Sequence, residues 1–193
     1  MCPSETRDPG GVLVLGGSGF LGVHVVELAA LEARPRREAV VSVARSSHPV
    51  PEGARCEVLD ATGDEGLDRC LERVRPRRVL LLAALSRLGD CEQSPARAEA
   101  LNADLPRRVA AWCAGAGARL EHVSTDLVFG STDAPPGGFR EEHPPGPVSV
   151  DGASKADGED AALAAHPGAL VVRLPLLYGD SRGRGLGASD SLL

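Results

Sequence analysis

Aromatic residues are scarce in this 193-residue sequence, which contains one tryptophan and one tyrosine and is 3% aromatic overall. A protein that binds single strands of nucleic acid uses rows of aromatic side chains as stacking platforms. Basic residues are also in the minority, because 27 acidic residues stand against 21 basic ones and the formal net charge is −6. Nucleic acids and anionic membrane surfaces favour a basic face. The composition therefore argues against both partners and favours a small-molecule ligand.

Long apolar segments are absent as well, and the longest apolar runs fall far short of the roughly 20 residues that span a bilayer. The first residues, MCPSETR, lack the basic patch and apolar stretch of a signal peptide, so we expect a cytoplasmic protein with reduced thiols. The five cysteines form no C-x-x-C pair, which fits neither a disulfide framework nor a zinc site. The five histidines show no metal-ligand spacing. We therefore predict no metal site.

Apolar, β-branched runs of strand length alternate with segments of helical spacing. The expected strands lie at residues 12–15, 39–43, 56–59, 79–84, 120–123 and 170–174, and the expected helices at 19–32, 65–74, 95–114 and 151–165. Such alternation predicts parallel strands joined by crossover helices. Because the strands are continuously apolar, we expect helices on both faces of the sheet. The prediction is an α/β fold with a doubly wound parallel sheet of the Rossmann type, as one domain over residues 1–193 with an ordered core at about 11–180.

A glycine-rich segment follows the first expected strand directly, where residues 16–22 read GGSGFLG. This segment satisfies G-x-G-x-x-G, in which glycines permit a tight turn and let backbone N–H groups approach a pyrophosphate at a helix N-terminus. The alternative is a glycine-rich turn that binds no ligand. The candidate cofactor-contacting residues here are Gly16, Gly19, Phe20, Leu21 and Gly22.

The end of the second expected strand bears on the type of dinucleotide. A carboxylate there would accept a hydrogen bond from the 2′-hydroxyl of NAD, but the chain instead has Arg45 beside two serines. A guanidinium suits the 2′-phosphate of NADP, so we expect NADP(H) in preference to NAD(H), although an arginine on a loop is also common without a ligand. Asp60 follows the third strand, where it would either contact the adenine edge or cap a turn.

Taken together, the motifs resemble the extended short-chain dehydrogenase/reductases, and within them the dTDP-4-dehydrorhamnose reductase group. The resemblance runs from Val12 to about Asp180. It is carried by residues 16–22, by Leu82-Ala83-Ala84, Cys91-Glu92 and Asn102, by STDLVF at 124–129, by P-x-x-x-DG-x-SK-x-x-GE at 147–159 and by R-x-P-x-x-YG at 173–179.

The resemblance implies roles for several residues. Ala83 and Ala84 would line the cofactor, and Thr125 would donate a hydrogen bond to the substrate carbonyl. Lys155 would hold the nicotinamide ribose and lower the pKa of a tyrosine one helical turn earlier. The family continues with most of a substrate-binding lobe, whereas this sequence ends soon after Tyr178, so we expect a nucleotide site with an open substrate side.

The sequence departs from the family pattern at the tyrosine position, which is Asp151. A carboxyl group beside an ammonium is driven towards its ionised form, so we expect Asp151 to have no proton to donate. Lys155 is nevertheless the single lysine among the 21 basic residues, which favours a site derived from the family's. The alternative is that Asp151 and Lys155 form only an exposed ion pair one turn apart on a helix.

Two hypotheses follow from these residues. In the first, the protein is an NADPH-dependent reductase of a 4-keto nucleotide sugar, as in dTDP-rhamnose biosynthesis, or an inactive derivative of one. In the second, it is a non-catalytic NADP-binding protein resembling the regulatory β subunit of methionine adenosyltransferase, whose ending is similar to residues 173–179. An unfinished substrate face would suit a homo- or hetero-oligomer.

Overall fold

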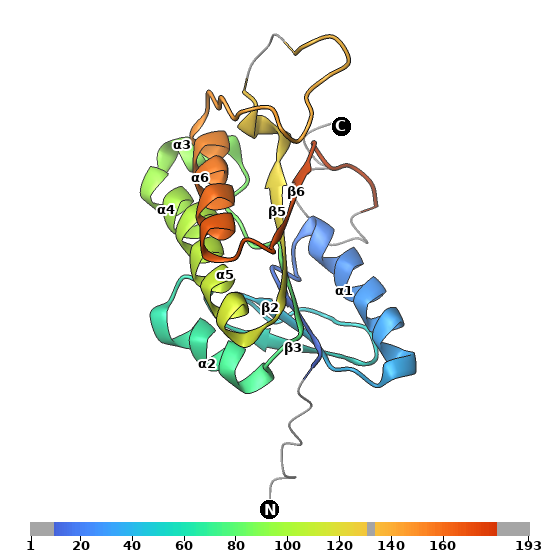
Figure 1. Ribbon diagram of the computed structural model, residues 1–193. Coiled ribbons are helices and arrows are strands. Elements are labelled where there is room, and N and C mark those ends of the chain that lie inside the picture. Colours follow the sequence, from blue (N-terminus) through green and yellow to red (C-terminus); the bar gives the residue numbers. More distant parts are fainter. Residues whose placement is uncertain (1–9, 131–133, 181–193) are drawn as a thin grey trace, which may run out of the picture.

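A six-stranded parallel sheet organises the computed structural model, which describes residues 10–130 and 134–180 (Figure 1). The strand order is β3-β2-β1-β4-β5-β6. The strands are β1 (Val12–Leu15), β2 (Val40–Ala44), β3 (Ala54–Val58), β4 (Arg78–Leu81), β5 (Arg119–Thr125) and β6 (Leu170–Leu174). The order reverses direction at β1, as in a doubly wound sheet, so the predicted fold class is confirmed.

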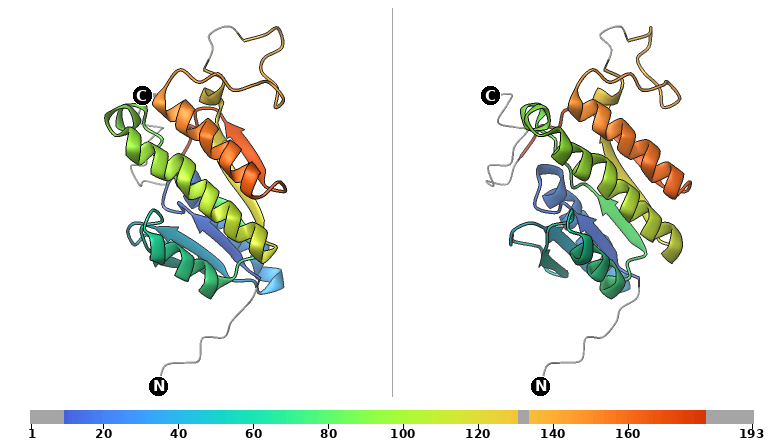
Figure 2. Two further views of the ribbon diagram at one scale, coloured as in Figure 1. Left: turned by 60° about the vertical axis from the view of Figure 1, so that its left-hand side comes forward. Right: turned by 90° about the vertical axis from the view of Figure 1, so that its left-hand side faces the viewer.

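Helices lie on both sides of this sheet. They are α1 (Phe20–Ala33), α2 (Asp64–Val74), α3 (Leu88–Gln93), α4 (Pro95–Glu99), α5 (Leu105–Ala116) and α6 (Val150–Ala165). In Figures 1 and 2, α1 lies on one face, and α2, α5 and α6 lie on the other. Right-handed crossovers explain the division, because the connection from β1 to β2 runs one way along the sheet and those from β3 onward run the other way.

Most predicted elements are present, with three differences. Strand β4 ends at Leu81 and not at residue 84, which leaves Ala83 and Ala84 in a loop. The single helix expected at 95–114 is α4, a π-helical turn (Ala100–Asp104) and α5 in succession. Helix α3 is not predicted by the sequence, because its six residues contain Gly89 and two acidic residues and have too little apolar periodicity.

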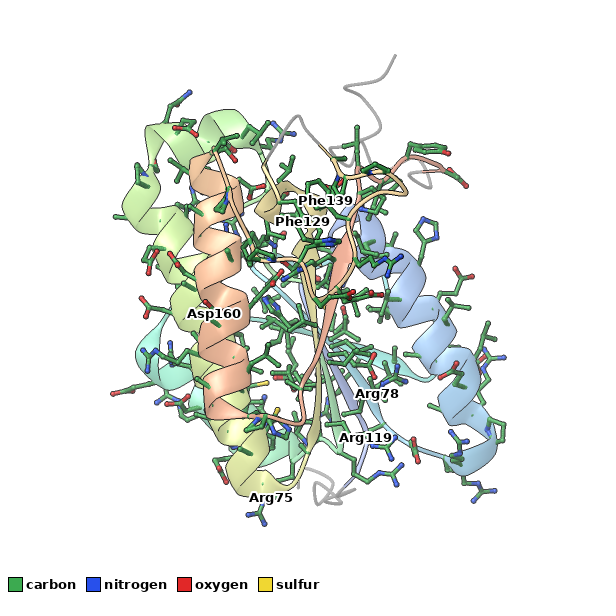
Figure 3. The ribbon with its side chains drawn as sticks, turned by 45° about the horizontal axis from the view of Figure 1, so that its top comes forward. Arg75, Arg78, Arg119, Phe129, Phe139 and Asp160 are labelled. Carbon is green, nitrogen blue, oxygen red and sulfur yellow. The ribbon has the colours of Figure 1, made fainter. Side chains whose placement is uncertain are left out.

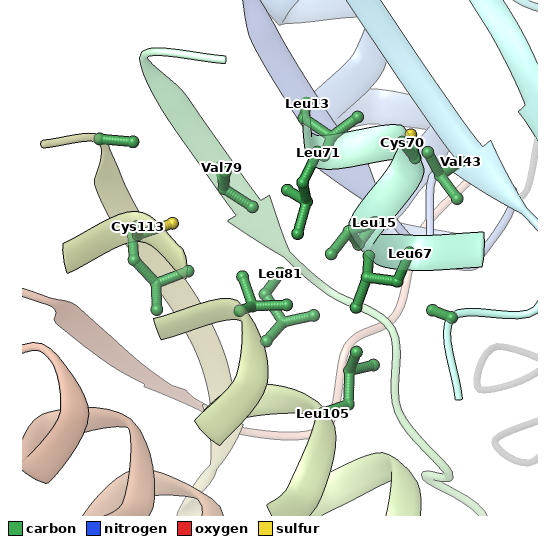
Figure 4. Packing of buried hydrophobic residues seen from close by; sticks show 14 of the residues in the cluster. Leu13, Leu15, Val43, Leu67, Cys70, Leu71, Val79, Leu81, Leu105 and Cys113 are labelled. Atoms are coloured by element: carbon green, nitrogen blue, oxygen red, sulfur yellow. The ribbon is translucent and has the colours of Figure 1, made fainter. Parts of the chain in front are cut away.

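Two apolar cores hold the layers together. The larger lies between the sheet and helices α2 and α5, where Leu13, Leu71 and Val79 are fully or almost fully buried (Figure 4). The smaller lies between the sheet and α1. Cys70 and Cys113 belong to the larger core, and burial raises the pKa of each thiol to about 12. These two thiols are therefore packing residues of the core.

The sheet is not covered evenly, so the expectation of helices over both faces is wrong for part of it. All residues of β1 and β2 are buried, whereas β5 alternates between buried residues and partly exposed ones. None of the β6 residues is fully buried. Among the described helices α1 alone lies on its face of the sheet, and it packs against β1 and β2. The α1-side face of β5 and β6 therefore has no described helix over it.

No helix among the described residues is long and apolar enough to cross a membrane. Residues 181–193, which follow the ordered core expected at about 11–180, lie outside the described residues.

Candidate functional site

A cavity of about 830 Å³ opens at the carboxyl ends of the central strands. In doubly wound sheets this edge, where the strand order reverses, is where ligands bind. Every site residue predicted from the sequence lines this cavity: Gly16, Gly19, Phe20, Leu21, Gly22, Arg45, Asp60, Ala83, Ala84, Thr125, Asp151 and Lys155. The structure thus brings together residues that lie up to 139 positions apart in the chain.

The glycine-rich turn forms the floor of the cavity. Gly16 has a φ of +92°, and its N–H donates to the carbonyl of Val43 at 2.9 Å. A Cβ on Gly16 would lie 2.6 Å from the backbone nitrogen of Ala83, and a Cβ on Gly22 would collide with the Gly16 carbonyl. Side chains are therefore excluded at both positions by the surrounding backbone.

Helix α1 begins directly after this turn. No side chain caps its N-terminus at Gly19, so the N–H groups of the first turn stay available to an anion. The helix dipole adds partial positive charge at the same place. The turn and the helix start thus form a cradle that a dinucleotide diphosphate fits.

A second part of the cavity wall carries Arg45, at the end of β2, and Asp60, after β3. One carboxylate oxygen of Asp60 accepts hydrogen bonds from the Thr62 backbone at 3.0 Å and the Thr62 hydroxyl at 2.6 Å. These bonds, with the positive charges of Arg45 and Arg97, lower the pKa of Asp60. Of the two roles left open for Asp60, the turn role is present, and its place on the wall is compatible with a ligand contact as well.

A third part of the wall holds the candidate chemical groups. Thr125 is the last residue of β5, and its hydroxyl accepts from the Leu127 N–H at 3.2 Å and lies 3.3 Å from a carboxylate oxygen of Asp126. Lys155 projects from α6, and its Nζ donates to the Val123 carbonyl at 3.5 Å. Asp151 lies one turn earlier on the same helix.

Asp151 and Lys155 are not an exposed ion pair. Their exposed fractions are 3% and 5%, and the structure has no ion pair between these two described residues. Instead the Cys91 thiol, from α3, lies 3.8 Å from a carboxylate oxygen of Asp151. The alternative that the pair is only a solvated helix contact is therefore wrong, because both groups are packed into the domain.

The expectation that Asp151 is driven to its ionised form is also wrong in direction. Burial raises the pKa of Asp151 and outweighs the opposing effect of Lys155. Burial likewise lowers the pKa of Lys155, despite the nearby carboxylate. Removal from water disfavours both charged forms, and this cost exceeds their mutual attraction. Asp151 therefore keeps its proton to a higher pH than an ordinary aspartate does.

Asn102, which the resemblance names without a role, supports this part of the wall. The π-helical turn directs its amide inward, where Nδ2 donates to the Leu85 carbonyl and the Ser154 hydroxyl at 2.9 and 3.0 Å. Its Oδ1 accepts from the Leu85 N–H at 2.9 Å. The loop after β4 is thereby fixed to α6, which carries Lys155.

Arg173 braces the far side of the wall. Its guanidinium pairs with buried Glu159 of α6 at 2.7 to 3.1 Å and lies 4.8 Å from the centre of the Phe129 ring. Phe129 in turn stacks on Phe139, and Figure 3 shows these two rings together beside the end of β5. These contacts fix the position of Arg173, which directly precedes Leu174, a residue of the cavity wall.

Two arginines of the cavity wall were not predicted from the sequence: Arg87, before α3, and Arg97, on α4. An exposed arginine on a helix gives no sequence signal that separates it from a solvated one. Neither guanidinium, nor that of Arg45, makes an ion pair or hydrogen bond within the described residues. Three unpaired guanidinium groups on one cavity of an acidic chain favour an anionic ligand.

Comparisons with known proteins agree with this geometry. The RmlD substrate binding domain family matches residues 10–188. The chain is 35% identical over 168 residues to a dTDP-4-dehydrorhamnose reductase of Streptomyces griseus, covering 86% of this chain and 50% of that protein. It is 32% identical over 180 residues to methionine adenosyltransferase 2 subunit beta of Pongo abelii, covering 88% of this chain and 47% of that one.

Solved structures show the same relationship. A dTDP-4-dehydrorhamnose reductase from Bacillus anthracis str. Ames, in complex with NADP, is similar with a TM-score of 0.74 and 27% identity, over 91% of this chain and 56% of that one. MoeE5 in complex with UDP-glucose and NAD is similar with a TM-score of 0.66 and 30% identity, over 88% and 54%.

The chain spans about half the length of the curated relatives that it matches. The resemblance to the dTDP-4-dehydrorhamnose reductase group is confirmed. This chain belongs to the RmlD substrate-binding-domain family.

Proposed function

We propose that the protein is an NADP(H)-dependent reductase of a 4-keto nucleotide sugar, of the dTDP-4-dehydrorhamnose reductase type. The observation that carries the proposal is the meeting of Thr125, Asp151 and Lys155 on the wall of a cavity whose floor is the glycine-rich turn. A hydroxyl donor, a carboxyl group and an ammonium thus lie beside a dinucleotide cradle. A relative of 35% identity carries this enzyme's name.

Several residues of the cavity wall are suited to separate parts of a dinucleotide. The turn at Gly16 and the start of α1 would hold the diphosphate, because no side chain caps α1 and the N–H groups of its first turn stay available to an anion. Ala83 and Ala84 would pack against the cofactor, and Lys155 would hold the nicotinamide ribose. When bound, the reduced nicotinamide supplies the hydride for a carbonyl carbon.

Preference for NADP(H) over NAD(H) rests on Arg45. The end of β2 has no carboxylate to accept from a 2′-hydroxyl, and the Arg45 guanidinium has no ion pair within the described residues. A 2′-phosphate is the ligand group that this position suits.

The proton would come from Asp151. Burial keeps its carboxyl group protonated to higher pH, and a buried neutral carboxylic acid is a competent proton donor. Thr125 would donate its hydroxyl hydrogen to the carbonyl oxygen, in exchange for its present contact with Asp126. Lys155 would hold positive charge beside the oxygen on which negative charge develops.

A second function is favoured by the absence of tyrosine at position 151. In a non-catalytic, NADP-binding regulatory protein, similar to methionine adenosyltransferase 2 subunit beta, the cavity would bind the dinucleotide without turnover. The short side chain of Asp151 and its contact with Cys91 favour this alternative, because a carboxyl group turned towards a thiol is less available to a substrate.

The test is to incubate the purified chain with NADPH and a dTDP-4-keto-6-deoxy sugar and to follow NADPH absorbance and the sugar product. We expect turnover, and we expect Asp151→Asn to lower it at least about 100-fold while the exposed control Asp157→Asn has no effect. NADPH binding without turnover, unchanged by Asp151→Tyr, would favour the regulatory function. Absence of binding to either dinucleotide would contradict both.

The cytoplasmic location, and a homo- or hetero-oligomer that covers the open α1-side face of β5 and β6, also stay proposals. The partly exposed residues of β5 and β6 support the second.

A further inference from the structure

Arg97, like Arg45, is an exposed arginine on the wall of the cavity. It comes from α4, more than 50 residues after Arg45 at the end of β2, yet both residues line the same cavity. The two positive charges both act on Asp60 and lower its pKa. Arg45, Asp60 and Arg97 thus line one cavity, and both guanidinium groups act electrostatically on the same carboxylate.

The charges of this part of the wall decide what it can bind. Arg45 and Asp60 alone would present no net charge, so Arg45 by itself would attract a phosphate weakly. Arg97 changes the balance to one net positive charge. A 2′-phosphate carries roughly −1.5 to −2 charge at neutral pH, as phosphate monoesters do, and such a group gains most from two guanidinium partners.

Neither the Arg45 nor the Arg97 guanidinium forms an ion pair or a hydrogen bond within the described residues. Other arginines do have such a partner: Arg107 of α5 pairs with Asp104, and Arg73 of α2 pairs with Glu57. Arg45 and Arg97 are exposed, so they bind a phosphate without first breaking an internal contact.

The apolar wall next to the two arginines has the character of a base-binding slot. Leu59 and Ala61 flank Asp60, and Leu101, in the π-helical turn after α4, lies one helical turn after Arg97. All three apolar residues line the cavity. Arg97 thus lines the cavity together with apolar residues that suit an adenine ring, and we expect the 2′-position of the attached ribose to lie near it.

We infer that Arg97 is a second specificity-determining residue, and that Arg45 and Arg97 together bind the 2′-phosphate of NADP(H). The inference rests on the proposed dinucleotide-binding function and deepens it, since it assigns the NADP(H) preference to a residue that the sequence pattern does not single out.

The test is to titrate NADP⁺, NAD⁺, 2′,5′-ADP and 5′-AMP into the wild-type chain and into Arg97→Ala, Arg45→Ala and the double variant. Arg107→Ala is the matched control, since it removes an exposed arginine that does not line the cavity. We expect Arg97→Ala to weaken NADP⁺ and 2′,5′-ADP about tenfold and NAD⁺ and 5′-AMP less than about twofold. Arg107→Ala is expected to change none of them.

The outcomes separate the inference from the function on which it rests. Equal weakening of NADP⁺ and NAD⁺ by Arg97→Ala overturns the inference and places Arg97 on a group that both dinucleotides share. Unchanged binding of both also overturns it, while the proposed function stands. A wild-type chain that binds neither dinucleotide overturns the function and the inference together. The thermal midpoint of each ligand-free variant verifies folding, which an exposed arginine does not control.

Discussion

The two halves of the cavity are formed by different kinds of residue. The nucleotide half, made of β1 to β3 with α1, is shaped by glycines and apolar strands, and Ser42 is its one buried polar residue among those described. The chemical half, made of the end of β4, β5, β6 and the helices α3 to α6, contains the other buried polar and charged residues: Asn102, His122, Ser124, Asp151, Ser154, Lys155 and Glu159.

The difference teaches how each half fails. The shape of the nucleotide half depends on steric fit, which pH does not change. The stability of the chemical half depends on buried groups whose charge has to be compensated, and an unpaired buried charge is costly. We therefore expect the loss of stability caused by a substitution to be independent of pH in the nucleotide half and to depend on buried charge in the chemical half.

The largest expected effect is in the chemical half. Arg173→Met leaves the carboxylate of Glu159, 3% exposed, without its partner and lowers the free energy of unfolding by about 3 kcal/mol or more. Arg78→Met is the matched control, because it breaks a half-exposed bidentate pair with Glu121 and is expected to cost at most about 1 kcal/mol. Urea unfolding of both variants measures the difference, and equal losses would break the comparison.

The next effect is in the nucleotide half. Gly22→Ala sets a methyl group against the Gly16 carbonyl, so we expect a loss of about 2 to 3 kcal/mol and at least tenfold weaker dinucleotide binding. Gly89→Ala in α3 is the control, since a Cβ there has open space around it. The Gly22→Ala loss is expected to be the same from about pH 5 to about pH 8. A loss that varies with pH would contradict the steric account.

Asp151→Asn is a smaller change that tests the electrostatic account. The folded pKa of Asp151 is raised above its ordinary value of 3.8, so ionisation costs more in the folded chain than in the unfolded one. The contribution of Asp151 to stability is therefore greatest at low pH and falls as pH rises through the folded pKa. The difference in thermal midpoint, wild type minus Asn variant, should shrink from about pH 4 to about pH 7. A difference that grows with pH would mean that Lys155 dominates after all.

The smallest effect concerns Asp60. Thr62→Val removes the hydroxyl that donates to this carboxylate, so the pKa of Asp60 should rise towards its ordinary value and stability at neutral pH should fall by at most about 1 kcal/mol, because Asp60 is exposed and solvent screens the contact. Because the pKa of Asp60 is lowered in the folded chain, this stabilisation is present above the unfolded pKa and is lost as pH falls. An NMR titration of Asp60 measures the shift, and an unchanged pKa would show that Arg45 and Arg97 suffice.

The nucleotide half could be predicted from the sequence because its signals are local. The glycine spacing at 16–22 and the apolar run before it report directly on backbone conformation and burial. The parallel sheet followed from the same kind of pattern, repeated along the chain.

The state of Asp151 could not be predicted in this way. The sequence gives its spacing from Lys155, and that spacing suggests an ionised acid. The cost of removing Asp151 from water depends on the elements packed around α6, and the Cys91 thiol, 60 positions earlier, only partly opposes the resulting rise in its pKa. Arg97 was missed for a related reason, since only the folded chain shows that this helix face lines the cavity.

The glycine-rich turn has a consequence for the order in which a newly made chain folds. Gly16 donates to Val43 of β2 and packs against Ala83 after β4, so its two supports leave the ribosome at different times. Strands β1, β2 and β3 are neighbours and can pair first, whereas β4 closes against the other edge of β1 only after another 20 or more residues have been synthesised. We therefore expect a partly synthesised chain to form the start of a sheet before it can hold a dinucleotide, and we expect the ligand to stabilise only chains that extend beyond Ala83.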